Sequence, residues 1–426
     1  MWRHRIRPRK DWERIVTEQG LIFPVTTKDD GTTVPYWNES AWYEVTMDEV
    51  ERLESATEEL WSLCIDAVAH MVSPGSGMTD ARLGLPAGSL DLVRRSVEAG
   101  EKSVYARFDL VYGADGSLKM LEINGDTPTG LVETAVAQWR WLEDVLPDAD
   151  QWNSVHDRLV ARWAELRTSG AIEGDHVHFV YHLGGGAEYD DGELEMTIHY
   201  MMDTAIQAGL TVMAHPVSEV GWNPDHREFR DAHDLPLRNV FKLYPWEDML
   251  GERFGQMLLE GREARPVTWF EPAWKALLST KAILPVLWER NPGHRHLLPA
   301  YFDEPRDLLQ WVAKPLHGRE GDNVRVHLAD GSEDVQMPGA YGAEGFVYQG
   351  YAELPSYEGN RVVIGSWVVG GEAAGMLVRE SDGLVTDYYS RVVPHVISDT
   401  VSPDPAQVRA WLTDRVGADV PTLPAS

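Results

Sequence analysis

The chain has 426 residues, of which 43% are hydrophobic and 25% are charged, as in a globular protein with two or three packed subdomains. It carries 38 lysines and arginines against 68 aspartates and glutamates, which gives a net charge of −30. Such a surface repels nucleic acid phosphates and anionic lipids, and the chain contains no apolar run of about 18 residues. We therefore expect neither a nucleic acid partner nor a membrane partner. The charge favours cationic ligands, although a solvated acidic surface also serves solubility alone.

The N-terminal segment MWRHRIRPRKDWERI is basic, but no apolar run follows it, so we do not expect a secretory signal. The single cysteine, Cys64, lies in an apolar stretch with helical spacing and cannot form an internal disulfide. We expect it to be a buried, unreactive thiol. The lack of paired cysteines fits a reducing compartment, so we expect a cytoplasmic protein.

Along residues 1–150 the pattern predicts a helix over 40–72, because its apolar residues recur at spacings of three, four and seven. Residues 104–124 predict a β-hairpin, since two alternating runs flank the turn signal Ala-Asp-Gly-Ser at 114–117. A second helix is expected to begin near Leu131.

Residues 151–265 predict a βαβ unit. Strands are expected over 176–183 and 210–217, a Gly triplet makes the loop at 184–186, and a helix runs over 193–209. A strand–helix–strand order favours a parallel sheet. The triplet is not a GxGxxG motif and carries no P-loop lysine, so alone it is a weak phosphate signal.

Residues 266–400 predict a helix before Pro285, then strands on both sides of a glycine-containing loop at 318–321. Three later segments, 345–355, 361–381 and 384–397, read as strands joined by glycine turns, which indicates an antiparallel arrangement. The proline-containing tail, 401–426, predicts a short helix and a loose end.

The first candidate site lies on the hairpin. Glu122 and Asn124 stand two apart, so they face the same side of their strand. Pairing across the turn brings Asp109 beside them, and carboxylate and amide oxygens are ligands suited to magnesium. Arg107, two residues before Asp109, has the planar fork that binds phosphate or carboxylate. The alternative is a surface hairpin with an Arg–Asp pair.

The second candidate group would bind phosphate. Lys314 ends a strand before the loop Gly318-Arg319-Glu320-Gly321, whose glycines let the backbone approach a phosphate closely. Lys281 is expected in a helix, where a surface lysine with a partly buried stem is the alternative. Residues 348–355 are interpreted as a hinge against an adenine or, equally well, as an edge strand.

Two further sets complete the candidates. Arg379 and Arg391, beside Asp387, are either exposed ion pairs or a cationic wall for a triphosphate. Acidic residues in the first turn of the 193–209 helix are explained by the helix dipole or by anchoring an amine substrate. This set is Glu193, Glu195 and Thr197.

Taken together, four strings resemble the glutathionylspermidine synthase family, the synthetase module of the ATP-grasp type. They are RFDLVYG…LEINGDTPTGLVETAVAQWRWLED (107–144), FEPAWKALLSTKAILPVLWE (270–289), AKPLHGREGDNV (313–324) and VIGSWVVGGEAAGMLVRES…VTDYYSRVVPHVI (363–397). The resemblance covers nearly the whole chain, with the metal-binding hairpin placed before the nucleotide lysines.

The resemblance implies an α/β (α+β) ATP-grasp-type fold over 1–426, with antiparallel nucleotide-binding subdomains and an inserted parallel βαβ subdomain. The expected parts are 1–150 with the metal-binding hairpin, 151–265 as the substrate subdomain, 266–400 as ATP-binding lid and central sheet, and the tail 401–426. Bifunctional members of the family carry an amidase with a Cys nucleophile before the synthetase. Since this chain begins almost directly with the synthetase, we expect no amidase activity.

The resemblance also implies residue roles and two cofactors, ATP and Mg²⁺. Arg107 would stabilise an acyl phosphate and the tetrahedral intermediate, and Lys314 would share the catalytic work. Amine contacts would fall at Glu193, Glu195 and Thr197. Metal ligands would be Asp109, Glu122 and Asn124; nucleotide contacts would be Lys281, Lys314, Gly318, Arg319, Gly321, Gln349, Tyr351, Leu354 and Arg379.

The function expected from this resemblance is an ATP- and Mg²⁺-dependent ligase. It would join a glutathione-like carboxylate to a spermidine-like amine through an acyl phosphate, with a lid around 311–350 closing over the intermediate. Two alternatives stay open, a non-catalytic nucleotide-binding or regulatory protein and a small-molecule phosphotransferase. The sequence leaves the individual substrates and the oligomeric state open.

Overall fold

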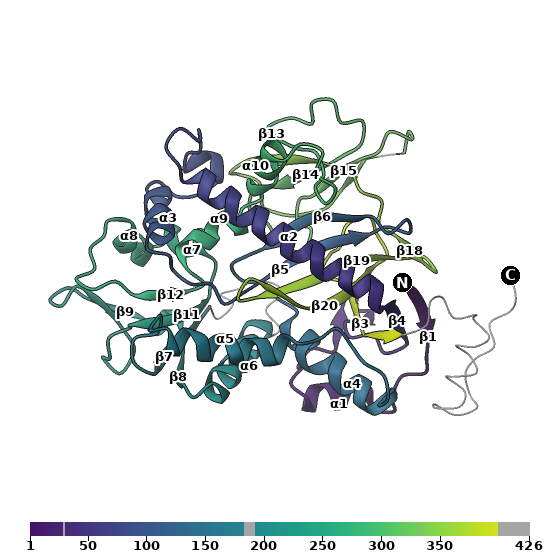
Figure 1. The fold of residues 1–426 in the computed structure, drawn as a ribbon, viewed down its shortest axis with the longest axis horizontal. Coiled ribbons are helices and arrows are strands. Elements are labelled where there is room, and N and C mark those ends of the chain that lie inside the picture. Colours follow the sequence, from purple (N-terminus) through teal and green to yellow (C-terminus); the bar gives the residue numbers. More distant parts are fainter. Residues whose placement is uncertain (29, 183–191, 333, 399–426) are drawn as a thin grey trace, which may run out of the picture.

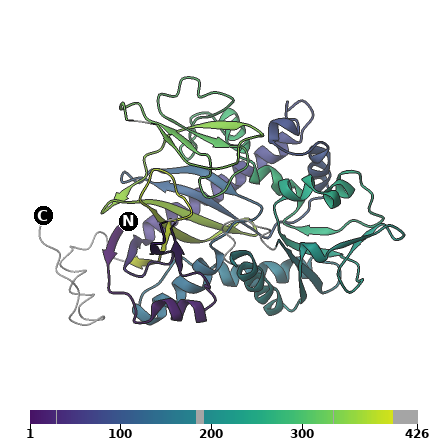
Figure 2. The same ribbon diagram turned by 180° about the vertical axis from the view of Figure 1, so that it is seen from behind.

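The computed structural model describes residues 1–426 except 29, 183–191, 333 and 399–426. A central antiparallel sheet is crossed by the long helix α2 and lies below a five-stranded sheet in the view of Figure 1. A parallel sheet and the N-terminal strands lie at opposite ends of the central sheet, and the view from behind in Figure 2 shows the same arrangement. The predicted tail lies outside the described residues.

The central sheet contains the predicted hairpin. Its strands run in the order β21-β20-β19-β5-β6, every neighbouring pair is antiparallel, and β18 pairs with β19. All residues of β5 are buried, because α2 and its neighbours cover one face while the other face lines a cavity. The strands are β5 (Tyr105–Tyr112), β6 (Leu118–Asn124), β18 (Ser356–Tyr357), β19 (Asn360–Val369), β20 (Glu372–Ser381) and β21 (Arg391–Val393).

Helix α2 (Met47–Met71) covers the central sheet with the predicted apolar face, which includes the fully buried Cys64. Burial raises the pKa of that thiol, as expected for an unreactive cysteine. The predicted start at residue 40 was wrong, because Ala41–Thr46 forms strand β4 and Thr46 caps the helix in a capping box with Glu49. Among the described residues, no helix has both the length and the apolar composition needed to cross a bilayer.

The parallel sheet confirms the predicted βαβ unit. Its strands run in the order β12-β11-β7-β8, and α6 (Glu193–Gln207) connects β7 to β8. Its last strand, β12, lies beyond the expected boundary at residue 265, and the Gly triplet at 184–186 lies outside the described residues. The strands are β7 (His176–Tyr181), β8 (Thr211–Pro216), β11 (Asn239–Leu243) and β12 (Thr268–Phe270).

The five-stranded sheet is antiparallel, with the order β13-β17-β14-β15-β16. The stretch expected to be one helix before Pro285 is helical in two separate parts. The chain instead turns at 280–282 between α9 (Ala276–Ser279) and α10 (Ile283–Arg290), and Pro285 lies in the first turn of α10, where a missing N–H breaks no helical hydrogen bond. The strands are β13 (Ala300–Phe302), β14 (Trp311–Pro315), β15 (Arg325–His327), β16 (Val335–Gln336) and β17 (Phe346–Gly350).

The remaining strands form small sheets. Strand β4 pairs antiparallel with β1 (Trp2–Arg5) and parallel with β22 (His395–Ser398), so the expected antiparallel arrangement fails at the last strand. The two-stranded sheets are β2 (Val25–Thr27) with β3 (Thr33–Pro35), and β9 (Gly221–Asn223) with β10 (Glu228–Arg230). The other helices are α1 (Trp12–Glu18), α3 (Ser89–Glu98), α4 (Gln138–Val145), α5 (Val155–Thr168), α7 (Trp246–Gly251) and α8 (Arg253–Leu259), with helical turns at Ala81–Leu83, Glu133–Ala137, Val217–Glu219 and Ala273–Lys275.

The turn after β6 is fixed by two buried lysines. The Asp126 carboxylate accepts hydrogen bonds from the Lys242 ammonium at 2.6 Å and from the Trp246 amide at 2.9 Å. The Lys275 ammonium donates to the carbonyl oxygen of Gly125 at 2.6 Å and to that of Tyr105 at 2.8 Å. Burial raises the pKa of the Asp126 carboxyl to about 6 against the opposing charge of Lys242. These bonds tie the end of the hairpin to the parallel sheet and to the 273–275 turn.

We predict that Gly125→Ala lowers the free energy of unfolding by about 1–3 kcal/mol, the usual cost of overpacking. A Cβ at position 125 would overlap the Cβ of Leu278 and lie 3.1 Å from its carbonyl oxygen. The matched control is Gly251→Ala, where a Cβ meets no atom within 4 Å and the free energy should change by less than about 0.5 kcal/mol. Urea unfolding followed by circular dichroism measures both, and equal midpoints would contradict the prediction.

Candidate functional site

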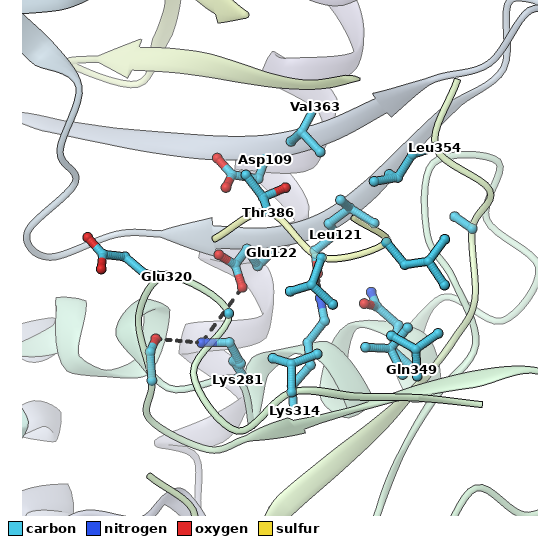
Figure 3. A pocket seen from close by; sticks show the side chains of 18 of the residues that line it. Asp109, Leu121, Glu122, Lys281, Lys314, Glu320, Gln349, Leu354, Val363 and Thr386 are labelled. Carbon is cyan, nitrogen blue, oxygen red and sulfur yellow. Dashed lines mark hydrogen bonds and ion pairs between the residues drawn. The ribbon is translucent and has the colours of Figure 1, made fainter. Parts of the chain in front are cut away.

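A cavity opens between the central sheet and the five-stranded sheet. Figure 3 shows side chains from both sheets pointing into it. Eleven residues proposed from the sequence as metal or nucleotide contacts line this one cavity. They are Asp109, Glu122, Lys281, Lys314, Gly318, Arg319, Gly321, Gln349, Tyr351, Leu354 and Arg379.

The hairpin register brings the predicted carboxylates together. Asp109 pairs directly with Glu122 across β5 and β6, and Arg107 pairs with Asn124 two residues further along. Directly opposed residues project from the same face of a sheet, so the four side chains share one face. The register shifts between Asp109 and Leu110, a β-bulge beside the carboxylate pair.

Asp109 lies between two arginines. Its Oδ1 accepts a hydrogen bond from Arg107 Nε at 2.9 Å, and its Oδ2 accepts one from Arg379 Nη2 at 2.5 Å. Arg107 also donates to the carbonyl oxygen of Thr129. The alternative of a surface hairpin was wrong, because Arg107 and Asp109 are only 5% and 3% exposed. The Arg–Asp pair exists, but it is part of the buried wall of the cavity.

Glu122 is held in its ionised form. Burial alone would raise the pKa of its carboxyl, but nearby positive charges lower it to about 2. The nearest of these is the Lys281 ammonium, 3.7 Å from Oε2. The full set is Lys281, Lys314, Arg379 and Arg107. A carboxylate surrounded by cations can accept a metal ion or balance the phosphates of a ligand.

The two lysines approach Glu122 from different elements. Lys314, on β14, donates from Nζ to the carbonyl oxygen of Leu121 at 2.8 Å, and burial lowers its pKa to about 8 although Glu122 opposes this. Lys281 lies in the turn between α9 and α10, and not within a helix as expected. Its Nζ donates to the carbonyl oxygen of Gly318 at 3.0 Å, and its side chain is only 11% exposed, so the surface-lysine alternative was wrong.

The 318–321 loop closes one side of the cavity against residues 385 and 386. Gly321 has a φ of +73°, and a Cβ there would lie 2.5 Å from Val385 Cγ1 and 2.9 Å from the Thr386 carbonyl oxygen. Only glycine fits both the backbone conformation and the close approach. The loop therefore presents its backbone directly to the space beside Lys281.

The opposite end of the cavity is apolar, and most of its residues were not proposed from the sequence. The edge-strand alternative for 348–355 was wrong, because β17 lies between β13 and β14. Buried Gln349 donates from Nε2 to the carbonyl oxygen of Met120 at 3.2 Å. Further apolar residues line the cavity. Val385 lies against the 318–321 loop, and the others are Leu121, Val312, Val324, Val326, Val363 and Leu384. Alternation marked Val312, Val326 and Val363, on β14, β15 and β19, as parts of sheet faces, but nothing in the sequence said that two such faces meet at a cavity.

Arg391 does not belong to the cationic wall. It is paired across the strands with Glu380, the neighbour of Arg379, so it projects from the opposite face of the sheet. There its Nη2 donates to Asp382 at 2.7 Å and to Asn360 at 2.9 Å. The expected grouping of Arg391 with Arg379 was therefore wrong.

The proposed amine contacts lie in the first turns of α6. Thr197 is buried, and its Oγ1 has no hydrogen-bond partner among the described residues. Leu194, between Glu193 and Glu195, lines a second cavity. A third cavity adjoins it through Asp248, and Arg319 lines all three. The second cavity is otherwise lined by Thr127, Thr129, His182, Leu243, Tyr244, Pro245 and Glu252.

The donor set on the hairpin fits a magnesium ion. Two carboxylates and an amide supply the hard oxygen ligands that Mg²⁺ prefers. Asn124 Nδ2 is buried without a hydrogen-bond partner in the described structure, so no protein contact fixes the orientation of this amide. Within the described part of the chain, the nearest charged partner of the Glu122 oxygens is the Lys281 ammonium at 3.7 Å.

Comparison with known proteins places these features in context. The sequence model described as glutathionylspermidine synthase preATP-grasp matches residues 3–398. A Haemophilus influenzae protein named putative acid–amine ligase is 39% identical over 373 residues, covering 84% of this chain and 90% of that protein. Glutathionylspermidine synthase of Crithidia fasciculata is 24% identical and covers 85% of this chain; trypanothione synthetase of the same organism is 26% identical and covers 69%. This chain spans only 59% and 47% of those two longer relatives.

Among solved structures, a glutathione synthetase-like effector from Globodera pallida in its apo form superimposes with a TM-score of 0.52. The alignment covers 91% of this chain and 98% of the effector at 10% sequence identity, so the likeness concerns the fold alone. With the family match, it confirms the predicted α/β fold of the ATP-grasp type.

We predict a pH-dependent stability contribution from Lys314. Its pKa of about 8 lies below the usual 10.5, so between these values the unfolded state binds more protons than the folded state. The free energy of unfolding of the wild type should therefore rise with pH across this window relative to Lys314→Met, by at most about 1.4 kcal/mol per pH unit. Urea unfolding of both proteins at several values from pH 7.5 to 10 measures the difference, and parallel curves would contradict the prediction.

Proposed function

The chain belongs to the glutathionylspermidine synthase family, as its motifs predicted, and from this premise we propose that it is an ATP-dependent carbon–nitrogen ligase. One observation carries the proposal. Two cross-strand carboxylates meet three cationic side chains, Lys281, Lys314 and Arg379, in a cavity that is otherwise largely apolar. A nucleotide with its divalent metal ion has the same division between an apolar base and a charged phosphate chain.

The nucleotide would lie along the cavity between the two antiparallel sheets. Its adenine would occupy the apolar end near Gln349, Tyr351 and Leu354, where the buried Gln349 amide restricts the shape of the pocket. Its phosphates would lie beside Lys281, Lys314 and the 318–321 loop. Backbone amides of a glycine-containing loop and lysine ammonium groups are common phosphate ligands in proteins.

Asp109, Glu122 and Asn124 would hold Mg²⁺, which neutralises charge on the phosphates when bound. The arginines on both sides of Asp109 donate hydrogen bonds to its two oxygens and fix the orientation of that carboxylate. Lys281 and Lys314 would exchange part of their interaction with Glu122 for contacts with the phosphates. The wall of the cavity is thus charged before the nucleotide arrives, which reduces the reorganisation needed for catalysis.

The proposed reaction has two steps. A substrate carboxylate oxygen attacks the γ-phosphorus of ATP, the bond to the β-phosphate oxygen breaks, and an acyl phosphate and ADP result. An amine nitrogen then attacks the acyl carbon, loses a proton and expels inorganic phosphate. Arg107 and Lys314 would stabilise the negative charge that develops on the acyl phosphate and the tetrahedral intermediate. Closure of the 311–350 lid would exclude water from that intermediate.

The substrates proposed are a glutathione-like carboxylate and a spermidine-like amine. The acidic groups around the second and third cavities favour a cationic amine there, and Arg319 lies at the junction with the nucleotide cavity. Burial and the neighbouring Glu247 charge raise the pKa of the Asp248 carboxyl, so a bound ammonium would relieve repulsion between these two groups. Glu193, Glu195 and Thr197 would complete the amine site from α6, beside Leu194.

The central experiment measures ADP and phosphate release with panels of peptide acids and amines, with products identified by mass spectrometry. A ligase releases ADP and phosphate in amounts matching the amide formed, and only when both substrates are present. Turnover without any amine would instead favour a phosphotransferase. Nucleotide binding without turnover across the panel would favour a regulatory protein.

We predict that Glu122→Gln reduces kcat by about 100-fold or more, because the variant keeps the shape of the side chain but removes a charge that faces the phosphates. The matched control is Glu289→Gln on the exposed face of α10, which should retain wild-type turnover. Steady-state ADP release measures both variants. Equal turnover of Glu122→Gln and wild type would contradict the assignment of the hairpin as the reacting site.

We also predict that nucleotide binding takes up about half a proton per chain at pH 8. Lys314 is half-protonated at this pH in the free protein, since its pKa is about 8, and nearby phosphates would raise that pKa. Calorimetric titration with a non-hydrolysable ATP analogue in buffers of different ionisation enthalpy measures the uptake. Lys314→Met should show none, and equal uptake by both proteins would exclude Lys314 as the source.

A further inference from the structure

A buried cluster of two histidines and one aspartate lies in the parallel-sheet region. His178 is on β7, His215 is on β8, and Asp231 directly follows β10; they are 3%, 3% and 6% exposed. The strand register pairs His178 with Met213 and Val180 with His215, so both imidazoles project from the same face of the sheet. None of the three residues lines the cavities described above. We call them the His–His–Asp cluster.

The two oxygens of Asp231 have different environments. Oδ1 accepts hydrogen bonds from the backbone amides of His233 at 2.9 Å and Leu235 at 2.8 Å, which fix the orientation of the carboxylate. Oδ2 is buried without a hydrogen-bond partner among the described residues and lies 3.6 Å from His215 Nε2 and 3.9 Å from His178 Nδ1. A buried carboxylate oxygen without a partner is costly, so its position next to two ring nitrogens requires an explanation.

Hydrogen bonding within the cluster does not provide a donor for Asp231 Oδ2. His178 Nδ1 lies 3.3 Å from His215 Nε2, so one ring can donate to the other, and this leaves the Asp231 oxygen without a donor. A histidine ring nitrogen that carries no proton offers a lone pair, so a metal ion placed between the three residues can bind both rings and the Asp231 oxygen.

The spacing of the three atoms matches a metal centre. They form a triangle with sides of 3.3, 3.6 and 3.9 Å, and the circle through its corners has a radius of about 2.1 Å. Zinc–nitrogen bonds measure about 2.0–2.1 Å and zinc–carboxylate bonds about 2.0–2.2 Å. One ion can therefore contact all three atoms without movement of the backbone.

We propose that the His–His–Asp cluster binds a divalent transition metal ion of the zinc class, in a site separate from the nucleotide cavity. His178, His215 and Asp231 are its ligands. The ion joins the β7–β8 edge of the parallel sheet to the segment after β10 and supplies the positive charge that Asp231 lacks. A further imidazole lies beside the cluster: the ring centroid of His176 is 4.6 Å from that of His178, and its buried Nε2 has no partner in the described structure.

The test is titration of the chelator-treated full chain with Zn²⁺ against a chromophoric competitor, in excess Mg²⁺ to saturate the hairpin. We expect one tight Zn²⁺ per chain, with affinity reduced more than about 100-fold in Asp231→Asn and in His215→Ala. Zn²⁺ should also raise the Tm of the wild type but not that of Asp231→Asn. Glu122→Gln should bind Zn²⁺ like the wild type, which separates this site from the hairpin.

The matched control is His327→Ala. It removes an exposed histidine whose Nδ1 lies 2.7 Å from Asp334 Oδ1, an exposed His–Asp pair outside the His–His–Asp cluster. It should bind Zn²⁺ like the wild type. If the cluster variants do not fold, NMR of the wild type loaded with Co²⁺ decides the question, and strongly shifted ring protons of two histidines are expected. Absence of Zn²⁺ binding by the wild type, unchanged affinity in the folded cluster variants, or no shifted histidine protons would overturn the proposal.

Discussion

The structure depends on one electrostatic arrangement, the placement of buried Asp109 and partly buried Glu122 opposite each other on a hairpin whose first strand is fully buried. Two neighbouring carboxylates in such a site repel each other and lose part of their hydration. Arg107 and Arg379 donate hydrogen bonds to Asp109, and nearby positive charges, led by Lys281 and Lys314, lower the pKa of the Glu122 carboxyl. The cations in turn lose hydration, and burial lowers the pKa of Lys314 for that reason. Each group is thus stable only in the presence of the others, so the hairpin, the 281 turn, β14 and β20 are positioned together.

A second set of buried charges connects this arrangement to the rest of the fold. Lys242 comes from the parallel sheet and Lys275 from the turn after β12, and both bind the chain where it leaves the hairpin. The Glu271 carboxylate accepts hydrogen bonds from the backbone amides of Val104 at 2.8 Å and Tyr105 at 3.0 Å, and these bonds fix the start of β5 as well. The hairpin is therefore held at both ends by the region that carries the proposed amine site. Such a connection keeps two substrates in a fixed relation across a boundary between subdomains.

The sequence was sufficient for the local structure and for the hairpin chemistry. Alternation and turn signals located β5 and β6, and a two-residue spacing placed Glu122 and Asn124 on one face. It was not sufficient for relations set by distant segments. Lys281 was assigned to a helix because its neighbours are apolar. In the structure it lies in the turn at 280–282, where the Lys281 backbone amide donates a hydrogen bond to the carbonyl oxygen of Leu316. Arg391 was grouped with Arg379 from sequence spacing alone. The pairing of β20 with β21 across the 382–390 loop decides which face of the sheet each arginine projects from, and spacing does not reveal that pairing. The apolar half of the cavity was missed because each valine there resembles ordinary sheet core.

The close contact at Gly321 has a consequence for the economy of the proposed reaction. The 318–321 loop packs against residues 385 and 386 and leaves no room for a side chain at position 321, so these two segments close the cavity on that side. Water that reaches an acyl phosphate can hydrolyse it, and each hydrolysis wastes one ATP. A methyl group at position 321 would hold the loops apart and admit solvent beside the phosphates. For the proposed reaction, the absence of a side chain at position 321 would therefore limit the loss of ATP to hydrolysis.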